Sequence, residues 1–253
     1  MMRSIYLVVV LGLLIQSVQA TTLTLVTLES PPAEFLRNGQ STGRNVEIAV
    51  ECLNRMGFKS SVMIIPWKRA MIMVEKGLAD AIIDAAYNTE RANFLYYPDE
   101  EIYVEEWYAF KRKRETVSFN RDLSNVGKFT LGITRGFEYG GIIQKAINNN
   151  KFKDTQEVVD NEMNIRKLIS NRFDTFVGVK LTILNLANKI GHADQIEMVT
   201  MTETGKPYLL SSSKTYVAFS KMTMTKNIAE TFSITLKKMK ADGTVSAIEA
   251  QYY

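Results

Sequence analysis

Hydrophobic residues along the chain follow two periods, one of two residues and one of three to four, and these periods alternate. Residues 21–28, TTLTLVTL, alternate as a β-strand does. From Val46 to Met56 the apolar residues recur every three or four positions, which predicts a helix that ends at Gly57. The elements predicted next are a strand over residues 59–66, a short helix over 67–76 and a strand over 79–86.

The order strand–helix–strand–helix–strand favours a mostly parallel sheet covered by helices. The pattern starts again after a basic run at residues 111–114, so the chain is predicted to form two similar α/β units. Residues 30–43 contain two prolines and an Asn-Gly pair, which predicts a loop. The elements predicted in the second half are strands over 128–134, 173–179 and 215–220, helices over 142–147, 164–172, 181–190 and 228–239, and a last short helix towards residue 253.

The first twenty residues have the pattern of a secretory signal peptide. Arg3 gives a positive start, residues 5–15 form a short apolar core, and residues 18–20, Val-Gln-Ala, precede a predicted cleavage site. The apolar core is too short to span a bilayer comfortably. We therefore expect an exported, periplasmic protein whose mature chain begins at Thr21.

The composition is that of an ordinary soluble globular protein. Of the 253 residues, 46% are hydrophobic and 23% are charged, and the formal net charge is +4. The dense basic run KRKR, residues 111–114, is predicted to be a solvated loop, and no aromatic–basic pattern suggests nucleic acid. No clustered metal-ligand spacing occurs, so we expect no metal and no cofactor.

The chain offers few residues for nucleophilic catalysis. Cys52, the single cysteine, lies at helical spacing within an apolar stretch, so we expect a small buried side chain. His192, the single histidine, follows a predicted helix end at Gly191, and any Ser-His-Asp set would depend on it. The residues therefore give little support to nucleophilic catalysis.

An arginine follows the predicted strand 79–86 in an unusual setting. Residues 87–103, YNTERANFLYYPDEEIY, place Arg91 beside a core and among aromatic side chains. Because a guanidinium is permanently charged and carries five donors in a planar fork, it needs a carboxylate or phosphate partner there. The partner is either a group of the protein, as in an internal ion pair or at a helix surface, or a bound ligand.

With these elements placed, nearly the whole mature chain resembles the family 3 periplasmic (extracellular) solute-binding proteins, which include the amino-acid receptors of ABC importers. No one stretch is diagnostic, but their order and spacing are fairly specific. The stretches that carry the resemblance are SPPAEFLRNGQSTGRNVEIAVECLNRMG, PWKRAMIMVEKGLADAIIDAAYNTERANFLYYPDEEIY, LGITRGFEYG, LISNRFDTFVG, and YVAFSK with a closing LKKMKADGTVSAIEAQYY.

The resemblance implies an α/β fold of the two-lobed periplasmic-binding-protein type (type II), with two strands crossing between the lobes and a ligand in the cleft. Lobe I would comprise residues 21–109 and 215–253, and lobe II residues 110–214. We expect a monomer that binds a small molecule and has the membrane subunits of an ABC importer as its partner.

The resemblance also assigns roles in the cleft. Arg91 matches the family arginine that grips the ligand carboxylate through two parallel bonds. Trp67 matches an aromatic platform on which the ligand stacks, with a packing residue under the cleft as the less favoured alternative. Residues 132–140 match a lobe II loop whose backbone amides, at a helix start, meet the charged end of the ligand. Its glycines could also simply make a turn.

Departures from the family pattern bear on the ligand. Val179 stands where amino-acid receptors carry an aspartate for the α-ammonium, and Asp174 is expected to cap or brace structure. Ser30 and Ala86 replace a platform aromatic and a hydroxyl-bearing residue. Asp84 or Glu138 could take over the ammonium, or could be exposed or paired within the protein. The residues expected to contact the ligand are Arg91, Trp67, Ser30, Asp84, Tyr87, Arg135, Gly136, Glu138 and Tyr139.

Three functional hypotheses follow from the resemblance. The first is a receptor that closes on a small carboxylate-bearing solute, amino-acid-like or another organic anion, and presents it to an importer. The second is a periplasmic sensory domain that reports to a signalling membrane protein. The third is an enzyme similar to the cyclohexadienyl dehydratases, with a cleft carboxyl as general acid. The genomic neighbourhood separates importer from sensor, and product formation would reveal an enzyme.

Overall fold

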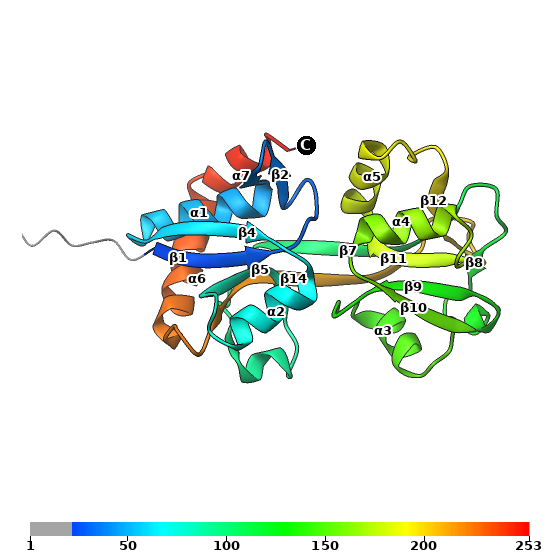
Figure 1. Cartoon of the computed structure of the whole chain (residues 1–253), viewed down its shortest axis with the longest axis horizontal. Coiled ribbons are helices and arrows are strands. Elements are labelled where there is room, and N and C mark those ends of the chain that lie inside the picture. The colour runs from blue at the N-terminus through cyan, green and yellow to red at the C-terminus, as the bar shows by residue number, and fades with distance from the viewer. Residues whose placement is uncertain (1–21, 253) are drawn as a thin grey trace, which may run out of the picture.

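The computed structural model describes residues 22–252, which fold into two α/β lobes joined by two long strands (Figure 1). The joining strands are β7 (Tyr103–Arg112) and β14 (Leu209–Ser220), which pair antiparallel. The predicted signal peptide, residues 1–20, and the cleavage point before Thr21 lie outside the described residues. Within the described residues, no helix is long and apolar enough to cross a membrane.

Lobe I is a mostly parallel sheet with helices on both faces. Its elements are β1 (Thr22–Thr27), β2 (Phe35–Arg37), β3 (Gln40–Thr42), α1 (Arg44–Arg55), β4 (Lys59–Ile64), α2 (Trp67–Glu75), β5 (Ala81–Ala86), the 3-10 helix η1 (Arg91–Asn93), β6 (Leu95–Tyr96), α6 (Lys226–Ala241) and α7 (Thr244–Glu249). β1 lies between β4 and β5, and all three are parallel. Leu23 and Leu25 pack with α1 and α6, whereas Val26 packs with α2, because successive side chains of a strand point to opposite faces.

Lobe II repeats this arrangement with shorter elements. They are β8 (Ser118–Phe119), the 3-10 helix η2 (Val126–Lys128), β9 (Thr130–Thr134), α3 (Gly141–Asn148), β10 (Asp154–Val158), α4 (Asn161–Ile169), β11 (Thr175–Val179), α5 (Lys180–Lys189), β12 (Ile196–Met198) and β13 (Thr200–Met201). β9 lies between β10 and β11, all parallel. Tyr139 and Ile143 belong to the core on one face, and Ile165 and Ile183 to the core on the other.

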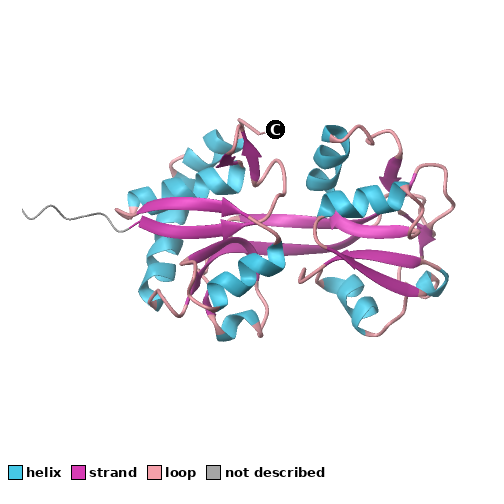
Figure 2. Cartoon of the chain, viewed as in Figure 1, coloured by secondary structure: helices cyan, strands magenta, loops and turns pink. Residues whose placement is uncertain are grey.

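The crossing strands make one continuous sheet of the two lobes. β7 pairs antiparallel with β11 of lobe II, and β14 pairs antiparallel with β5 of lobe I. Figure 2 shows the strands running through the centre of the molecule with the helices outside them. The predicted lobe boundaries, 109/110 and 214/215, fall within β7 and β14.

Two segments differ from the sequence predictions in their local structure. Residues 30–43, predicted as a loop, contain the hairpin of β2 and β3. β10 was not predicted because its residues DTQEV are mostly polar, and only Val158 is buried, as befits a strand at the sheet edge. By contrast, the prediction that Cys52 is buried is confirmed, since its side chain is fully inaccessible in the lobe I core.

The basic run at residues 111–114 is only partly a solvated loop, so that prediction is wrong for its first two residues. Lys111 and Arg112 complete β7, and Lys111 is only 7% exposed. Its ammonium donates to a carboxylate oxygen of Glu197 at 2.6 Å, while the Arg112 guanidinium donates to two backbone carbonyls. Because Lys111 and Arg112 have these partners within the protein, β7 can extend through both residues.

Candidate functional site

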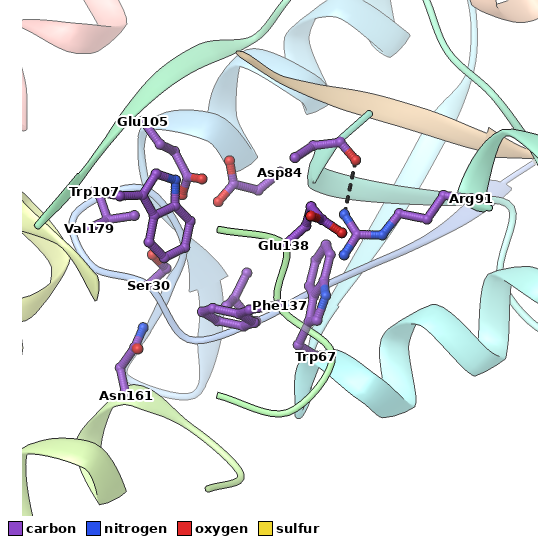
Figure 3. A pocket seen from close by; sticks show the side chains of 12 residues that line it. Ser30, Trp67, Asp84, Arg91, Glu105, Trp107, Phe137, Glu138, Asn161 and Val179 are labelled. Atoms are coloured by element: carbon purple, nitrogen blue, oxygen red, sulfur yellow. Dashed lines mark hydrogen bonds between the residues drawn. The ribbon is translucent and has the colours of Figure 1, made fainter. Parts of the chain in front are cut away.

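The cleft between the lobes contains a narrow inner chamber of about 30 Å³ (Figure 3). This volume is room for about two water molecules, so a solute can enter only when the lobes move apart. An outer chamber of about 240 Å³ adjoins it and shares Leu28, Trp67, Phe137 and Asn161 as walls. The residues lining the inner chamber are Leu28, Ser30, Trp67, Asp84, Ala86, Arg91, Glu105, Trp107, Phe137, Glu138, Asn161 and Val179.

Hydrogen bonds across the cleft hold the two lobes together. The indole nitrogen of Trp67 and the Nη2 of Arg91, both in lobe I, donate to the Gly136 carbonyl of lobe II at 3.0 Å each. The hydroxyls of Ser30 and Thr182 lie 2.8 Å apart, again between the lobes. The chain is therefore in a closed conformation in which lobe I donors converge on one lobe II carbonyl.

Arg91 is buried at this junction and is only 7% exposed. Its backbone N–H donates to the Asn88 side chain at 2.7 Å, which fixes the turn after β5, and its Nη1 donates to the Ala86 carbonyl at 2.9 Å. Burial lowers the pKa of the guanidinium, with opposing contributions led by Tyr97. Within residues 22–252 the Arg91 side chain forms no ion pair with a carboxylate. The structure thus shows neither the internal ion pair nor the exposed helix-surface arginine that the sequence left open.

Asp84 reaches the chamber because β5 contains a bulge. The register with β14 passes from Ala85 opposite Tyr216 to Ile82 opposite Ala218, so β5 has one residue more than its partner. Asp84 lies in the left-handed region, with φ 71°. A bulge interrupts the alternation of side chains and redirects one of them. Ala85 accordingly packs on the same face as Ile82, and the Asp84 side chain lines the chamber.

The carboxyl group of Asp84 belongs to a buried acidic cluster. Asp84 and Glu105 hydrogen-bond to each other and point toward one another in Figure 3. Behind them, the Asn45 amide donates to Glu34 at 2.5 Å and to Asp84 at 3.3 Å. Burial raises the pKa of all three carboxyls, and repulsion from Asp84 raises those of Glu34 and Glu105 further. The charge of Arg44 opposes each of these shifts.

The loop of residues 135–140 meets the cleft differently from the prediction. Its backbone contributes the Gly136 carbonyl, not amides of a helix start, because α3 begins only at Gly141. Arg135 lies outside both chambers, with a side chain that is 55% exposed and paired with Glu157 at 3.1 Å. Tyr139 is also outside the chambers, since its buried hydroxyl accepts from the Thr134 N–H at 2.6 Å.

The other predicted residues are divided between the chamber and the surface. Trp67, Ser30, Asp84, Arg91 and Glu138 line the inner chamber. Tyr87 does not: it is 57% exposed and contacts Tyr97 edge-on, with ring centroids 5.2 Å apart.

Val179 and Asp174, which the sequence did not assign to ligand contacts, have the positions expected of them. Val179 lines the chamber at the end of β11. Asp174 braces β9 by accepting from the backbone and the hydroxyl of Thr130, at 2.8 Å each.

Sequence reasoning missed Glu105 and Trp107, which lie on the inward face of β7. In the sequence of this strand, YVEEWYAFKR, apolar and polar residues do not alternate strictly, so periodicity gave little signal. Phe137 was also missed. Its ring lies 6.2 Å from that of Trp67 and 5.9 Å from that of Trp107, so the chamber has three aromatic walls. Among the described residues, no group of three or more His, Cys, Asp or Glu side chains is arranged to hold a metal ion.

Solved structures resemble this fold closely at low sequence identity. A histidine kinase sensor domain with similarity to periplasmic binding proteins has a TM-score of 0.77, 17% identity, and coverage of 92% of this chain and 96% of its own. An ancestral arginine-binding protein bound to arginine has a TM-score of 0.76, 18% identity, and coverage of 92% and 98%. The substrate-binding protein of an amino acid ABC transporter has a TM-score of 0.73, 15% identity, and coverage of 92% and 99%.

These likenesses confirm the two-lobed periplasmic-binding-protein fold. No curated protein sequence matches the chain. The family model of the bacterial extracellular solute-binding proteins, family 3, matches residues 23–253. Because that match runs through both lobes and both crossing strands of the cleft, the chain belongs to family 3 of the bacterial extracellular solute-binding proteins.

Proposed function

We propose that this protein is an exported receptor that closes its lobes on a small carboxylate-bearing solute, amino-acid-like or another organic anion. It acts in the periplasm as a monomer and presents the closed form to the membrane subunits of an ABC importer. The family assignment and the amino-acid-binding structures of the same fold support a small-solute receptor. The signal-like pattern of residues 1–20 supports export.

The environment of Arg91 carries the proposal. Its guanidinium is buried at the lobe junction, and its two hydrogen-bond acceptors are the neutral carbonyls of Ala86 and Gly136. A carboxylate is a stronger partner for a guanidinium than a carbonyl, because the bond is charge-assisted and can be bidentate. A solute carboxylate can therefore take the place of Gly136 on Arg91 when the lobes part. The other groups of the bound solute then contact lobe II and stabilise the closed conformation.

The test combines a ligand screen with one matched pair of variants. A thermal-shift screen of amino acids, dicarboxylates and small peptides identifies solutes, and calorimetry measures their affinity. Arg91→Lys keeps the charge but loses the planar fork, so affinity should fall by about thirtyfold or more, which corresponds to about 2 kcal/mol. Arg135→Lys, at an exposed pair in lobe II, should leave affinity unchanged. A screen without any binder, or equal affinity of Arg91→Lys and the parent, contradicts the proposal.

Two other functions have a specific observation in their favour. The sensor-domain structure has a TM-score as high as those of the amino-acid receptors, so the fold is compatible with a sensory domain. Pull-down of membrane partners with the liganded protein separates the two roles, because an importer and a signalling protein differ in subunit composition. The carboxyls of Asp84 and Glu105, with raised pKa values, are compatible with a general acid. Incubation with cyclic carboxylic acids tests this: we expect no product, and turnover would favour the enzyme.

A further inference from the structure

The inner chamber carries more negative than positive groups. Its lining includes the carboxyls of Asp84, Glu105 and Glu138 and one guanidinium, that of Arg91. Glu138 belongs to the outer side of the site, because its carboxylate accepts from the Asn88 amide at 3.1 Å. Asp84 and Glu105 are deeper and are only 8% and 7% exposed. A solute with nothing but negative charge would therefore face Arg91 on one side and two carboxyls on the other.

The carboxyls of Asp84 and Glu105 are arranged to accept a cation. They come from β5 and β7, two strands of the same sheet that both pair with β14, and they hydrogen-bond to each other. Two buried carboxyls in contact cannot both ionise easily unless a cation is near, so the pair retains a proton. An ammonium group at the same place brings the same single positive charge as the proton but supplies several N–H donors, so it can bond to both carboxylates and is a better partner.

An independent observation in the same chamber indicates a bound molecule. The indole N–H of Trp107 is buried, 4% exposed, and has no acceptor among residues 22–252. A buried donor without a partner costs free energy, so an acceptor atom from a solute would be stabilising there. The rings of Trp67, Trp107 and Phe137 present apolar faces, and aromatic faces attract ammonium groups.

We propose that Asp84 and Glu105 bind an ammonium group of the solute, while the indole N–H of Trp107 donates to an oxygen of the same molecule. The solute class is thus a carboxylate that also carries a primary amine. Its ammonium is held by lobe I and the adjoining part of β7, and not at Val179 in lobe II. This inference rests on the proposed solute-binding function and adds the amine to it.

The surroundings of the pair determine how it exchanges protons. The groups that face it from the elements around it are Glu34 before β2, Arg44 and Asn45 of α1, Tyr103 of β7 and Thr215 of β14. Arg44 supplies one positive charge for three carboxyls, so a proton remains when no solute is bound. The ammonium displaces that proton. Binding should consequently release about one proton and become tighter as pH rises through the range in which the pair loses its proton.

The first experiment compares solutes that differ only in the amine. The probes are L-arginine with 5-guanidinopentanoate, L-glutamine with 4-carbamoylbutanoate, and L-phenylalanine with 3-phenylpropanoate, each measured by calorimetry. We expect at least one amino acid to bind, and its partner without the amine to bind about thirtyfold more weakly or worse.

The outcomes separate this inference from the proposed function. An amine-free acid that binds as tightly as its amino acid overturns the ammonium site and leaves the receptor function standing. The same holds if none of the six binds but a dicarboxylate from the broad screen does. If nothing binds in either experiment, both the function and the inference fail.

The second experiment uses a matched pair of isosteric variants on β7. Glu105→Gln removes the carboxylate from the chamber, and Glu106→Gln changes its exposed neighbour. Glu105→Gln should weaken the amino acid by about thirtyfold or more and the amine-free acid by less than about threefold. The number of protons released on binding should also be smaller in Glu105→Gln than in the parent. Calorimetry in two buffers of different ionisation enthalpy measures that number. Glu106→Gln should change neither quantity.

A purely structural role of the pair gives a different result. In that case Glu105→Gln would lower the melting temperature of the ligand-free protein and weaken both kinds of probe equally, which overturns the inference. Asp84→Asn is the second variant. Asn tolerates the left-handed backbone at this position, so folding should be retained. Its amino-acid affinity should fall in the same selective way.

Discussion

The two walls of the cleft differ in the kind of group they offer to a solute. The wall formed by lobe I and the adjoining part of β7 holds buried ionisable groups with shifted pKa values, namely Glu34, Asp84, Arg91 and Glu105. The lobe II wall offers a backbone carbonyl, an aromatic ring and an aliphatic side chain, from Gly136, Phe137 and Val179. Its one carboxylate in the chamber lining, that of Glu138, is half-buried and lies on the outer side. Charge recognition is therefore concentrated on one side of the cleft.

This difference suggests an order of events during binding. A charged group that must lose its water on closure costs free energy. The charged groups of lobe I already have hydrogen-bond partners in their own lobe, such as Asn45 for Asp84 and the Ala86 carbonyl for Arg91. Lobe I can bind the charged ends of a solute first. Lobe II then adds a carbonyl and apolar contacts, which stabilise the closed state without bringing a new buried charge.

The largest expected effect comes from removing Arg44, whose charge stabilises the buried carboxyls of the lobe I wall. Arg44 is 1% exposed, and its charge lowers the pKa of each of the three buried carboxyls. Arg44→Met leaves those carboxyls without their cation, so the free energy of unfolding should fall by about 3–5 kcal/mol at pH 8. The loss should be smaller at pH 5, because burial raises the pKa of each carboxyl and so favours its protonated form as pH falls. Urea denaturation at both pH values measures it.

The control for this prediction is on the same helix. Arg55 pairs with Glu51 and Asp242 at the surface, and Arg55→Met should cost far less at either pH. An Arg44→Met protein as stable as the Arg55→Met protein would show that the lobe I charges are not organised around Arg44.

The second expected effect concerns the pH dependence of folding. Burial, and then repulsion from Asp84 and Glu34, raises the pKa of Glu105 well above its ordinary value of 4.5. The folded protein thus binds a proton that the unfolded chain has lost, and stability falls as pH rises through that range. Glu105→Gln does not titrate, so its melting temperature should exceed that of the parent by a few degrees at pH 8 and by less at pH 5. A difference that does not change with pH contradicts the shifted pKa.

The sequence predicted the lobes better than it predicted these walls. Most strands and helices before residue 100 were found because each packs one apolar face, which periodicity reveals, but the short strands β2, β3 and β6 were not found. β7 was overlooked because acidic and basic residues interrupt its alternation, and those same residues, Glu105 and Lys111, are buried with partners that only the folded chain supplies.

The site shows the same limit. Arg91 and Trp67 were named because they match residues of the family cleft, and Asp84 because it could replace the missing ammonium carboxylate; all three line the chamber. Glu34 and Arg44 lie in or next to a segment predicted as a loop, and nothing local indicates that they meet Asp84. Their roles depend on packing between distant segments. The bulge at Asp84 in β5 likewise could not be predicted from the sequence ADAIIDAA, which contains no glycine.

The third expected effect tests the lobe II carbonyl of Gly136 with a pair of tryptophans. The indole of Trp67 donates to the Gly136 carbonyl, whereas that of Trp107 has no partner within the described chain. Trp67→Phe should lower the stability of the closed ligand-free form by about 0.5–1.5 kcal/mol, the net value of one hydrogen bond. Solution scattering should then show a more extended protein. Trp107→Phe should leave the scattering unchanged and weaken only solute binding, so equal expansion in both variants would contradict the assignment.

The smallest expected effect lies at the rim of the cleft, where the lobes meet in water. Lys189 of α5 and Glu29 of lobe I form an ion pair at 3.2 Å, with side chains 58% and 30% exposed. Exposed pairs contribute little because water and salt screen them and two long side chains must be ordered. Lys189→Ala should therefore weaken solute binding by less than about threefold at low salt and not measurably at 0.5 M salt. A larger, salt-resistant loss would place charge recognition on lobe II as well, and the contrast between the two walls would not hold.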